Sequence, residues 1–142
     1  MGIAKRLVAV YLILTAAAVA LLLAATPLIH DGSEEYPLWQ ILNWFMAAGI
    51  VIAAAANVRR WMERDPNETN AVEYLRVAFA FYGVIVLAVI FCWNWFWTLN
   101  PDSETGGAIT SHLIHFPMMN MLYVIIAFGV ARRLWKSADE AA

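Results

Sequence analysis

Four long stretches of the sequence contain no Asp, Glu, Lys or Arg, and short polar links separate them. These stretches cover residues 7–29, 36–58, 77–101 and 105–131. Each is long enough to cross a bilayer, because roughly 20 apolar residues span the hydrocarbon core as a helix. The pattern predicts an all-α fold, a four-helix transmembrane bundle with very short loops. We expect the helices over 6–29, 37–59, 71–99 and 110–133, forming a single integral membrane domain over 1–142.

Local signals refine the ends of these helices. Pro37 suits the first turn of the second helix, where its missing N–H costs nothing. Asn70 followed by Glu73 is the pattern of a capping box and predicts the start of the third helix. Pro117 leaves two alternatives for the fourth helix. If the helix starts near Thr110, Pro117 lies inside it and bends it; if it starts at Phe116, Pro117 lies in its first turn.

Composition agrees with a chain that has lipid as its main solvent. Of the 142 residues, 63% are hydrophobic and 14% are charged, whereas a soluble domain carries about 25% charged residues. The first apolar stretch exceeds the roughly 7–15 residues of a signal peptide core, which favours a retained helix. A net charge of −2 gives no reason to expect a nucleic-acid partner. Cys92 is the single cysteine, so an intrachain disulfide is excluded.

The basic residues predict how the chain is oriented. Lys and Arg concentrate on the cytoplasmic side of membrane proteins. The two links at 30–36 and 100–107 contain neither, and all basic residues belong to the opposite side: Lys5, Arg6, Arg59, Arg60, Arg64, Arg76, Arg132, Arg133 and Lys136. We therefore expect both termini in the cytoplasm and the protein in a bacterial cytoplasmic (inner) membrane. The arginines serve as topology determinants, and they can also hold anionic lipid headgroups.

Side-chain amides gather at one predicted depth, in the outer part of the membrane. An uncompensated amide is costly in hydrocarbon, so these groups should face one another or a ligand. The sequence thereby suggests a polar pocket that would suit a small uncharged molecule such as a quinone. Its candidate residues are Gln40, Asn43, Asn94, Trp97 and Asn120.

The three histidines fall on the same outer side. His112 and His115 are three residues apart, which places them about 60° apart on a helix. With His30 and Met119 they form a candidate metal site, whose nitrogen and thioether ligands suit copper. Haem b is another alternative, and it would need His30 opposite His112 or His115. The alternative that needs no ligand is a set of interfacial histidines bonded to water, link carbonyls or headgroups.

The remaining chemistry narrows the function classes. No charged side chain lies in the middle of any span, which argues against a self-contained pump or proton antiporter. The sequence contains no catalytic triad, Gly-rich phosphate loop or HExxH motif, so nothing requires it to be an enzyme on its own. The leading interpretation is an accessory or structural subunit of a larger membrane complex. Its expected partners are lipid and other membrane subunits, or further copies of itself.

Overall fold

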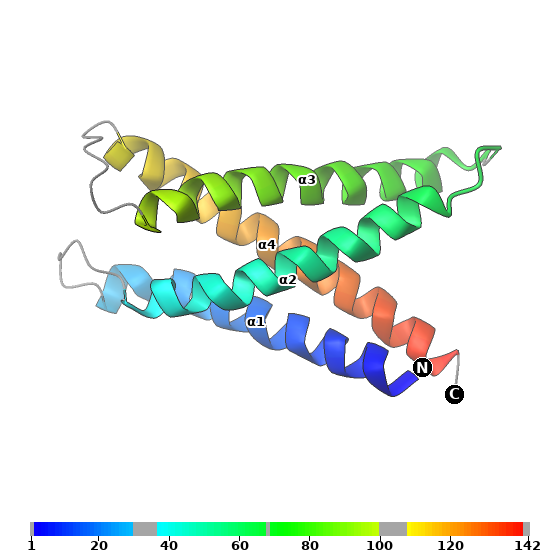
Figure 1. The fold of residues 1–142 in the computed structure, drawn as a ribbon, viewed down its shortest axis with the longest axis horizontal. Coiled ribbons are helices and arrows are strands. Elements are labelled where there is room, and N and C mark those ends of the chain that lie inside the picture. The colour runs from blue at the N-terminus through cyan, green and yellow to red at the C-terminus, as the bar shows by residue number, and fades with distance from the viewer. Residues whose placement is uncertain (1, 30–36, 68, 100–107, 141–142) are drawn as a thin grey trace.

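The computed structural model describes residues 2–29, 37–67, 69–99 and 108–140, with side chains in the last segment from Ile114 onward. These residues form four helices: α1 (Gly2–Ile29), α2 (Pro37–Met62), α3 (Ala71–Leu99) and α4 (Ala108–Asp139) (Figure 1). Each is long and apolar enough to cross a membrane. The predicted fold of four membrane-spanning helices is therefore confirmed, while the two links on the predicted outer side lie outside the described residues.

The helices run past the apolar stretches at the basic ends. α1 begins at Gly2 rather than residue 6, α2 continues to Met62 rather than 59, and α4 continues to Asp139 rather than 133. The added residues include Lys, Arg and Met, which are good helix formers. At the start of α3, the Oδ1 of Asn70 accepts the backbone N–H of Val72 at 3.0 Å and of Glu73 at 3.3 Å, as expected for the helix cap. α4 begins at Ala108, so Pro117 lies inside it.

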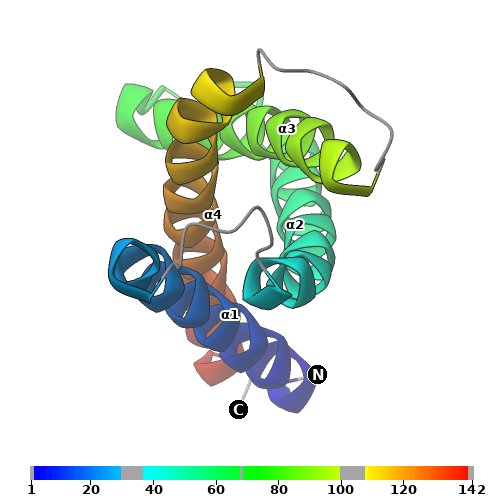
Figure 2. The same ribbon diagram turned by 90° about the vertical axis from the view of Figure 1, so that its left-hand side faces the viewer.

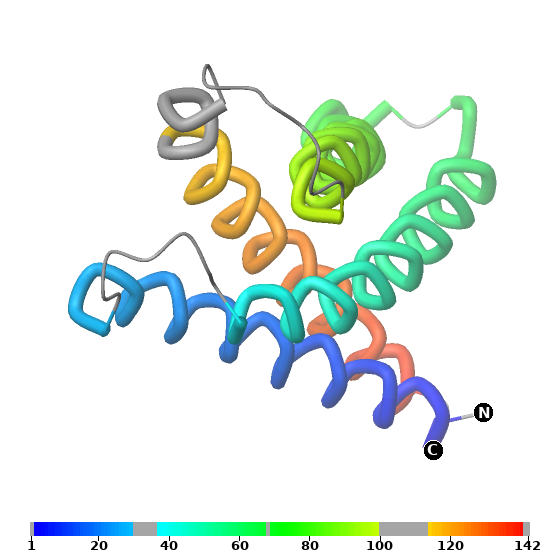
Figure 3. Tube along the Cα trace, turned by 60° about the vertical axis from the view of Figure 1, so that its left-hand side comes forward, coloured from blue at the N-terminus to red at the C-terminus, as the bar shows by residue number. Residues whose placement is uncertain are grey.

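The helices associate mainly as two pairs. α1 packs most extensively on α4, and α2 packs more on α3 than on α4. Among the described residues, α1 and α3 make no contact. Figure 2 views the bundle from the end opposite the termini and shows α1 and α3 on opposite sides of the molecule, as does the trace in Figure 3. Among the described residues, α3 therefore packs against α2 and α4 alone.

Both termini lie at one end of the bundle, together with the link between α2 and α3 (Figure 1). The two ends of the chain are joined there, because Arg6 forms an ion pair with Asp139 at 2.9 Å and Lys5 donates to the carbonyl of Ser137 at 3.4 Å. All nine Lys and Arg residues belong to this end, since they lie near the termini, at the end of α2, in the following link or in the first turns of α3. We call it the basic end.

A tyrosine at the centre of the molecule joins three helices. Tyr123 on α4 is 1% exposed. Its hydroxyl lies 2.8 Å from the Oγ1 of Thr15 on α1, within hydrogen-bonding distance. The same hydroxyl lies directly over Gly49 on α2, where an added Cβ would come within 2.3 Å of it. The small residue at 49 thus lets a polar contact between α1 and α4 form beneath α2, in agreement with the role of small residues in membrane helix packing.

Candidate functional site

Four asparagines lie inside the bundle. Asn43 and Asn57 on α2, Asn94 on α3 and Asn120 on α4 are all buried. Asn94 satisfies one donor within its own helix, because its Nδ2 donates to the carbonyl of Ile90 at 2.9 Å. Asn57 accepts a hydrogen bond from the Arg133 guanidinium at 2.9 Å. Asn57 therefore links α2 to α4. Buried amide groups that lack a hydrogen bond would be expected to find a partner, because buried polar groups are generally hydrogen-bonded.

The structure brings part of the predicted polar pocket together. Asn43, Asn94 and Met119 line one small cavity of about 10 Å³ near the end opposite the termini. A cavity of this volume has room for about one water molecule, far less than a quinone headgroup needs. Gln40 and Trp97 are exposed on the surface and do not line this cavity. In the residues that the structure describes, the cavity can therefore hold a bridging water but no larger ligand.

Asn120 stands apart from that cavity. Its side chain is 0% exposed, and neither its Oδ1 nor its Nδ2 has a hydrogen-bond partner among the described residues. An unpartnered buried amide costs about 1–3 kcal/mol. Asn120 is thus a source of instability in the isolated chain.

The candidate metal ligands are only partly described. His30 lies outside the described residues, and His112 lies in α4 at a position whose side chain is not described. His115 is exposed, with its ring edge-on to Trp93 at a centroid distance of 6.4 Å. Met119 is buried, on the wall of the small cavity. Within the described ranges, no three His, Cys, Asp or Glu side chains are grouped to hold a metal ion. The metal and haem sites stay predictions.

The tryptophans of α2 act in packing between helices. Trp39 is buried, donates its ring N–H to Thr26 of α1 at 3.1 Å and meets the Phe116 ring of α4 edge-on at 4.7 Å. Trp44 meets Trp95 of α3 edge-on at 4.7 Å. Such edge-on aromatic pairs stabilise packing beyond the area that they bury. The aromatic residues at the end of the bundle opposite the termini therefore stabilise the packing of the helix ends against one another.

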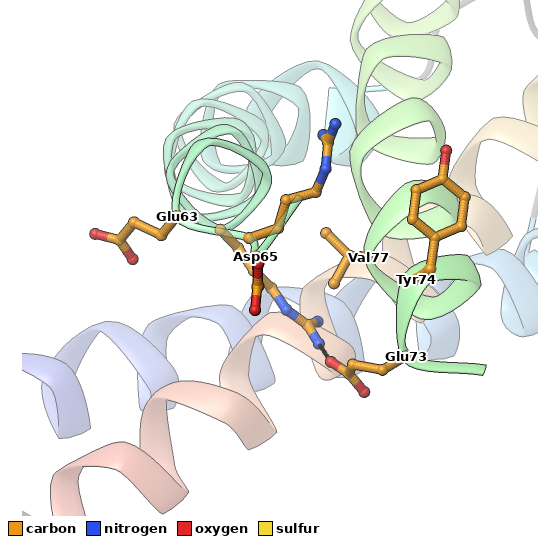
Figure 4. Close-up of a pocket in the computed structure, with 7 residues that line it drawn as sticks. Glu63, Asp65, Glu73, Tyr74 and Val77 are labelled. Carbon is orange, nitrogen blue, oxygen red and sulfur yellow. Dashed lines mark hydrogen bonds and ion pairs between the residues drawn. The ribbon is translucent and has the colours of Figure 1, made fainter. Parts of the chain in front are cut away.

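The basic end carries an ion-pair network that the spacing of residues in the sequence does not predict. Glu73 at the start of α3 accepts from Arg60 at the end of α2 and, at 2.6 Å, from Arg76 one turn further along α3. Figure 4 shows Glu73 turned toward the guanidinium group, whereas Glu63 points away from α3. The carboxylate expected to complete a helix cap therefore also joins α2 to α3.

The spacing of residues along α4 is a sequence signal for a further feature of the basic end, a helix face that carries both apolar and basic side chains. On α4, Leu122, Ile126, Gly129, Arg133 and Lys136 recur at spacings of four and three residues, so they share one face of the helix. That face changes from apolar to small to basic toward the C-terminus. By their positions in the sequence alone, the arginines indicate the topology and a lipid surface but not this face.

Comparisons of the chain with protein-family models, curated proteins and solved structures found no match. The exposed face of α3 and the basic end of the bundle are the two features of the chain that bear on its function.

Proposed function

We propose that this chain is an accessory subunit of a larger complex in a bacterial inner membrane, with its basic end in the cytoplasm, and that it contacts its partner through α3. The segregation of all nine basic residues at one end supports the orientation, because cationic residues are retained on the cytoplasmic side. The partner in this proposal is a transmembrane helix of another subunit.

The exposed face of α3 is the observation that carries the proposal. Tyr82, Val86, Val89, Trp93 and Phe96 are all exposed and recur at spacings of four and three residues. This is the spacing of the seam by which one helix packs along another. Of the apolar window of α3, 22% is buried in this chain, against 28%, 33% and 39% for the other spans. We call these five residues the α3 seam.

The large aromatic side chains of the seam also suit a protein partner. Tyr82, Trp93 and Phe96 are large and carry few rotatable bonds, so they lose little conformational freedom when a partner orders them. Aromatic residues are enriched in the anchoring positions of protein interfaces. The seam lies on the side of α3 opposite its buried residues Val84, Leu87 and Phe91.

Site-specific crosslinking in the native membrane tests this proposal. A photoreactive residue at Val89 lies in the middle of the seam, and the matched control is Leu21 on α1, which is also large, apolar and exposed. We expect a discrete adduct with another membrane protein from position 89 and lipid adducts alone from position 21. Lipid adducts alone from both positions would count against the proposal, as would an adduct of twice the mass of the chain.

Gentle extraction gives an independent check. An accessory subunit should leave the native membrane in a species larger than the chain and its detergent or lipid belt. Isolation of a monodisperse lone monomer, under conditions that preserve other complexes of the same membrane, would contradict the proposal.

A further inference from the structure

A cleft of about 770 Å³ opens between α3 and α4 at the basic end and reaches the end of α2. Its walls are basic toward the end of the bundle, where Arg132 and Lys136 line it, and apolar toward the middle of the membrane, where Phe79, Leu122 and Ile125 line it.

The apolar part of the cleft covers most of the depth of one lipid leaflet. It runs along α4 from Leu122 to Val130, which is about 12 Å at about 1.5 Å per residue. Half of a hydrocarbon core of about 30 Å is about 15 Å. Small residues keep the cleft open: a Cβ added at Gly129 would meet nothing within 4 Å, and one added at Gly83 would meet only Ile126, at 3.6 Å.

The basic part of the cleft holds five cationic side chains from three helices. They are Arg60, Arg76, Arg132, Arg133 and Lys136. Glu73 is bonded to Arg60 and Arg76. Arg132 and Lys136 have no carboxylate partner among the described residues, and Arg60 and Arg133 repel each other. This excess of positive charge favours an anion in the cleft.

Asn57 supplies an independent sign of a missing ligand. It is 2% exposed, and its Oδ1 accepts from Arg133. Because a guanidinium can only donate hydrogen bonds, the amide oxygen must face Arg133 and the amide N–H groups must point elsewhere. The Nδ2 is buried and has no partner within the described segments. Asn57 lines the cleft, so one buried donor beside the cleft is left unpaired among the described residues.

A neighbouring hollow at the same end lacks this character. It measures about 300 Å³ and is lined by Arg60 and Arg64, together with the carboxylates Glu63, Asp65 and Glu73 (Figure 4). Its charges of both signs compensate one another. An excess of cations is thus a property of the larger cleft and not of every hollow at the basic end.

We propose that the cleft binds one anionic glycerophospholipid from the leaflet at the basic end. Arg132, Arg133 and Lys136 hold its phosphate group. An acyl chain lies along the groove beside Gly129, between Phe79 of α3 and Ile125 of α4. A bilayer lipid suits this site better than a soluble anion, because the apolar wall continues for most of the depth of one leaflet.

Native mass spectrometry of the purified full-length chain tests the proposal. The protein is reconstituted in nanodiscs of phosphatidylcholine containing phosphatidylglycerol, released into mild detergent, and its retained lipids are counted. The cleft variant combines Arg132→Gln with Lys136→Gln. The matched control combines Arg59→Gln with Arg64→Gln, which removes the same charge from the same end outside the cleft.

We expect one retained phosphatidylglycerol in the wild-type chain and in the control variant. The cleft variant should bind it about thirty-fold more weakly, because each cation near the membrane surface strengthens anionic lipid binding about five-fold. Equal loss in the two double variants would overturn the proposal, as would equal retention of phosphatidylcholine. Competition by inorganic phosphate alone, with no lipid retained, would show a soluble-anion site and overturn it as well.

A third variant tests the groove without changing any charge. Gly129→Phe places a ring where nothing lies within 4 Å of the new Cβ, so it fills the cleft rather than disturbing the packing. We expect this variant to remain monodisperse and to retain at least ten-fold less phosphatidylglycerol. Full retention of the lipid in a folded Gly129→Phe protein would contradict the placement of the acyl chain.

Discussion

Replacing Gly49 by alanine would place a methyl group against the hydroxyl of Tyr123. The added Cβ would lie 2.3 Å from that oxygen and 3.1 Å from the Cζ of the ring, where an ordinary contact begins at 3.4 Å. Tyr123 is buried and bonded to Thr15, so the ring cannot swing into solvent or lipid. Either α2 or the tyrosine must move by about 1 Å, a distance that close-packed interiors resist.

The size of the effect follows from two opposing contributions. Overpacking in a core costs about 1–3 kcal/mol, whereas alanine in place of glycine within a helix gains up to about 1 kcal/mol. Because the added Cβ would lie deep inside van der Waals contact, the overpacking cost should be near its upper limit of about 3 kcal/mol, and we expect Gly49→Ala to lower the free energy of unfolding by about 2 kcal/mol. Gly129→Ala is the matched control, because its Cβ meets nothing within 4 Å. It should leave stability unchanged or raise it by up to about 1 kcal/mol.

The assay is reversible unfolding of the detergent-solubilised protein, with the fraction of SDS raised and tryptophan fluorescence recorded. Tyr123→Phe should cost only about 0.6 kcal/mol, as typical of a hydrogen bond between membrane helices. Thr15 still bonds the carbonyls of Tyr11 and Leu12 in that variant. Because the phenylalanine lacks the clashing oxygen, Gly49→Ala combined with Tyr123→Phe should be more stable than Gly49→Ala alone.

Two results would refute this reasoning. Gly49→Ala could behave as Gly129→Ala does, which would show that α2 and α4 are farther apart than described. Alternatively, the double variant could lose the sum of the two single losses. Residues in direct contact should instead show a coupling energy of about 1 kcal/mol or more.

Three further predictions use the same unfolding assay. Asn120→Leu should raise stability by about 1 kcal/mol, since it removes an amide without a partner among the described residues; a loss would reveal a bound partner. Asn57→Leu should lower stability by about 1–3 kcal/mol because it strands Arg133, and an unchanged midpoint would show that Arg133 has another acceptor. Glu73→Gln breaks the pair with Arg60 and should lower stability only slightly, by an amount that shrinks in high salt; a salt-independent loss would point to packing.

The spans could be predicted from the sequence because lipid tolerates so few charged side chains. Residues 77–101 contain no charged side chain, and this stretch makes up most of α3. The cap at Asn70 was also readable, since its partners lie within three residues. The absence of charge depends only on the lipid around a helix, and a helix cap depends only on residues within one turn. Both can therefore be predicted without knowing which helices are neighbours.

The site was harder to predict because the depth of a residue in the membrane does not determine which way its side chain points around the helix axis. Gln40 and Asn43 lie at similar depth on α2, yet Gln40 is exposed and Asn43 is buried against α3 and α4. The contact of Tyr123 with Thr15 and Gly49 depends on how three helices pack, and no spacing in the sequence records it. The cleft was missed for the same reason, since its cations come from α2, α3 and α4.

The central claim is that the four helices cross a bilayer with the basic end in the cytoplasm. Cysteine accessibility tests it most directly, in a Cys92→Ala background that leaves no other thiol. One new cysteine replaces Asn67, between α2 and α3, and another replaces Asp102, between α3 and α4. A membrane-impermeant maleimide applied to intact bacterial cells should label position 102 at once and position 67 only after lysis. Labelling of both positions from the same side would contradict the account.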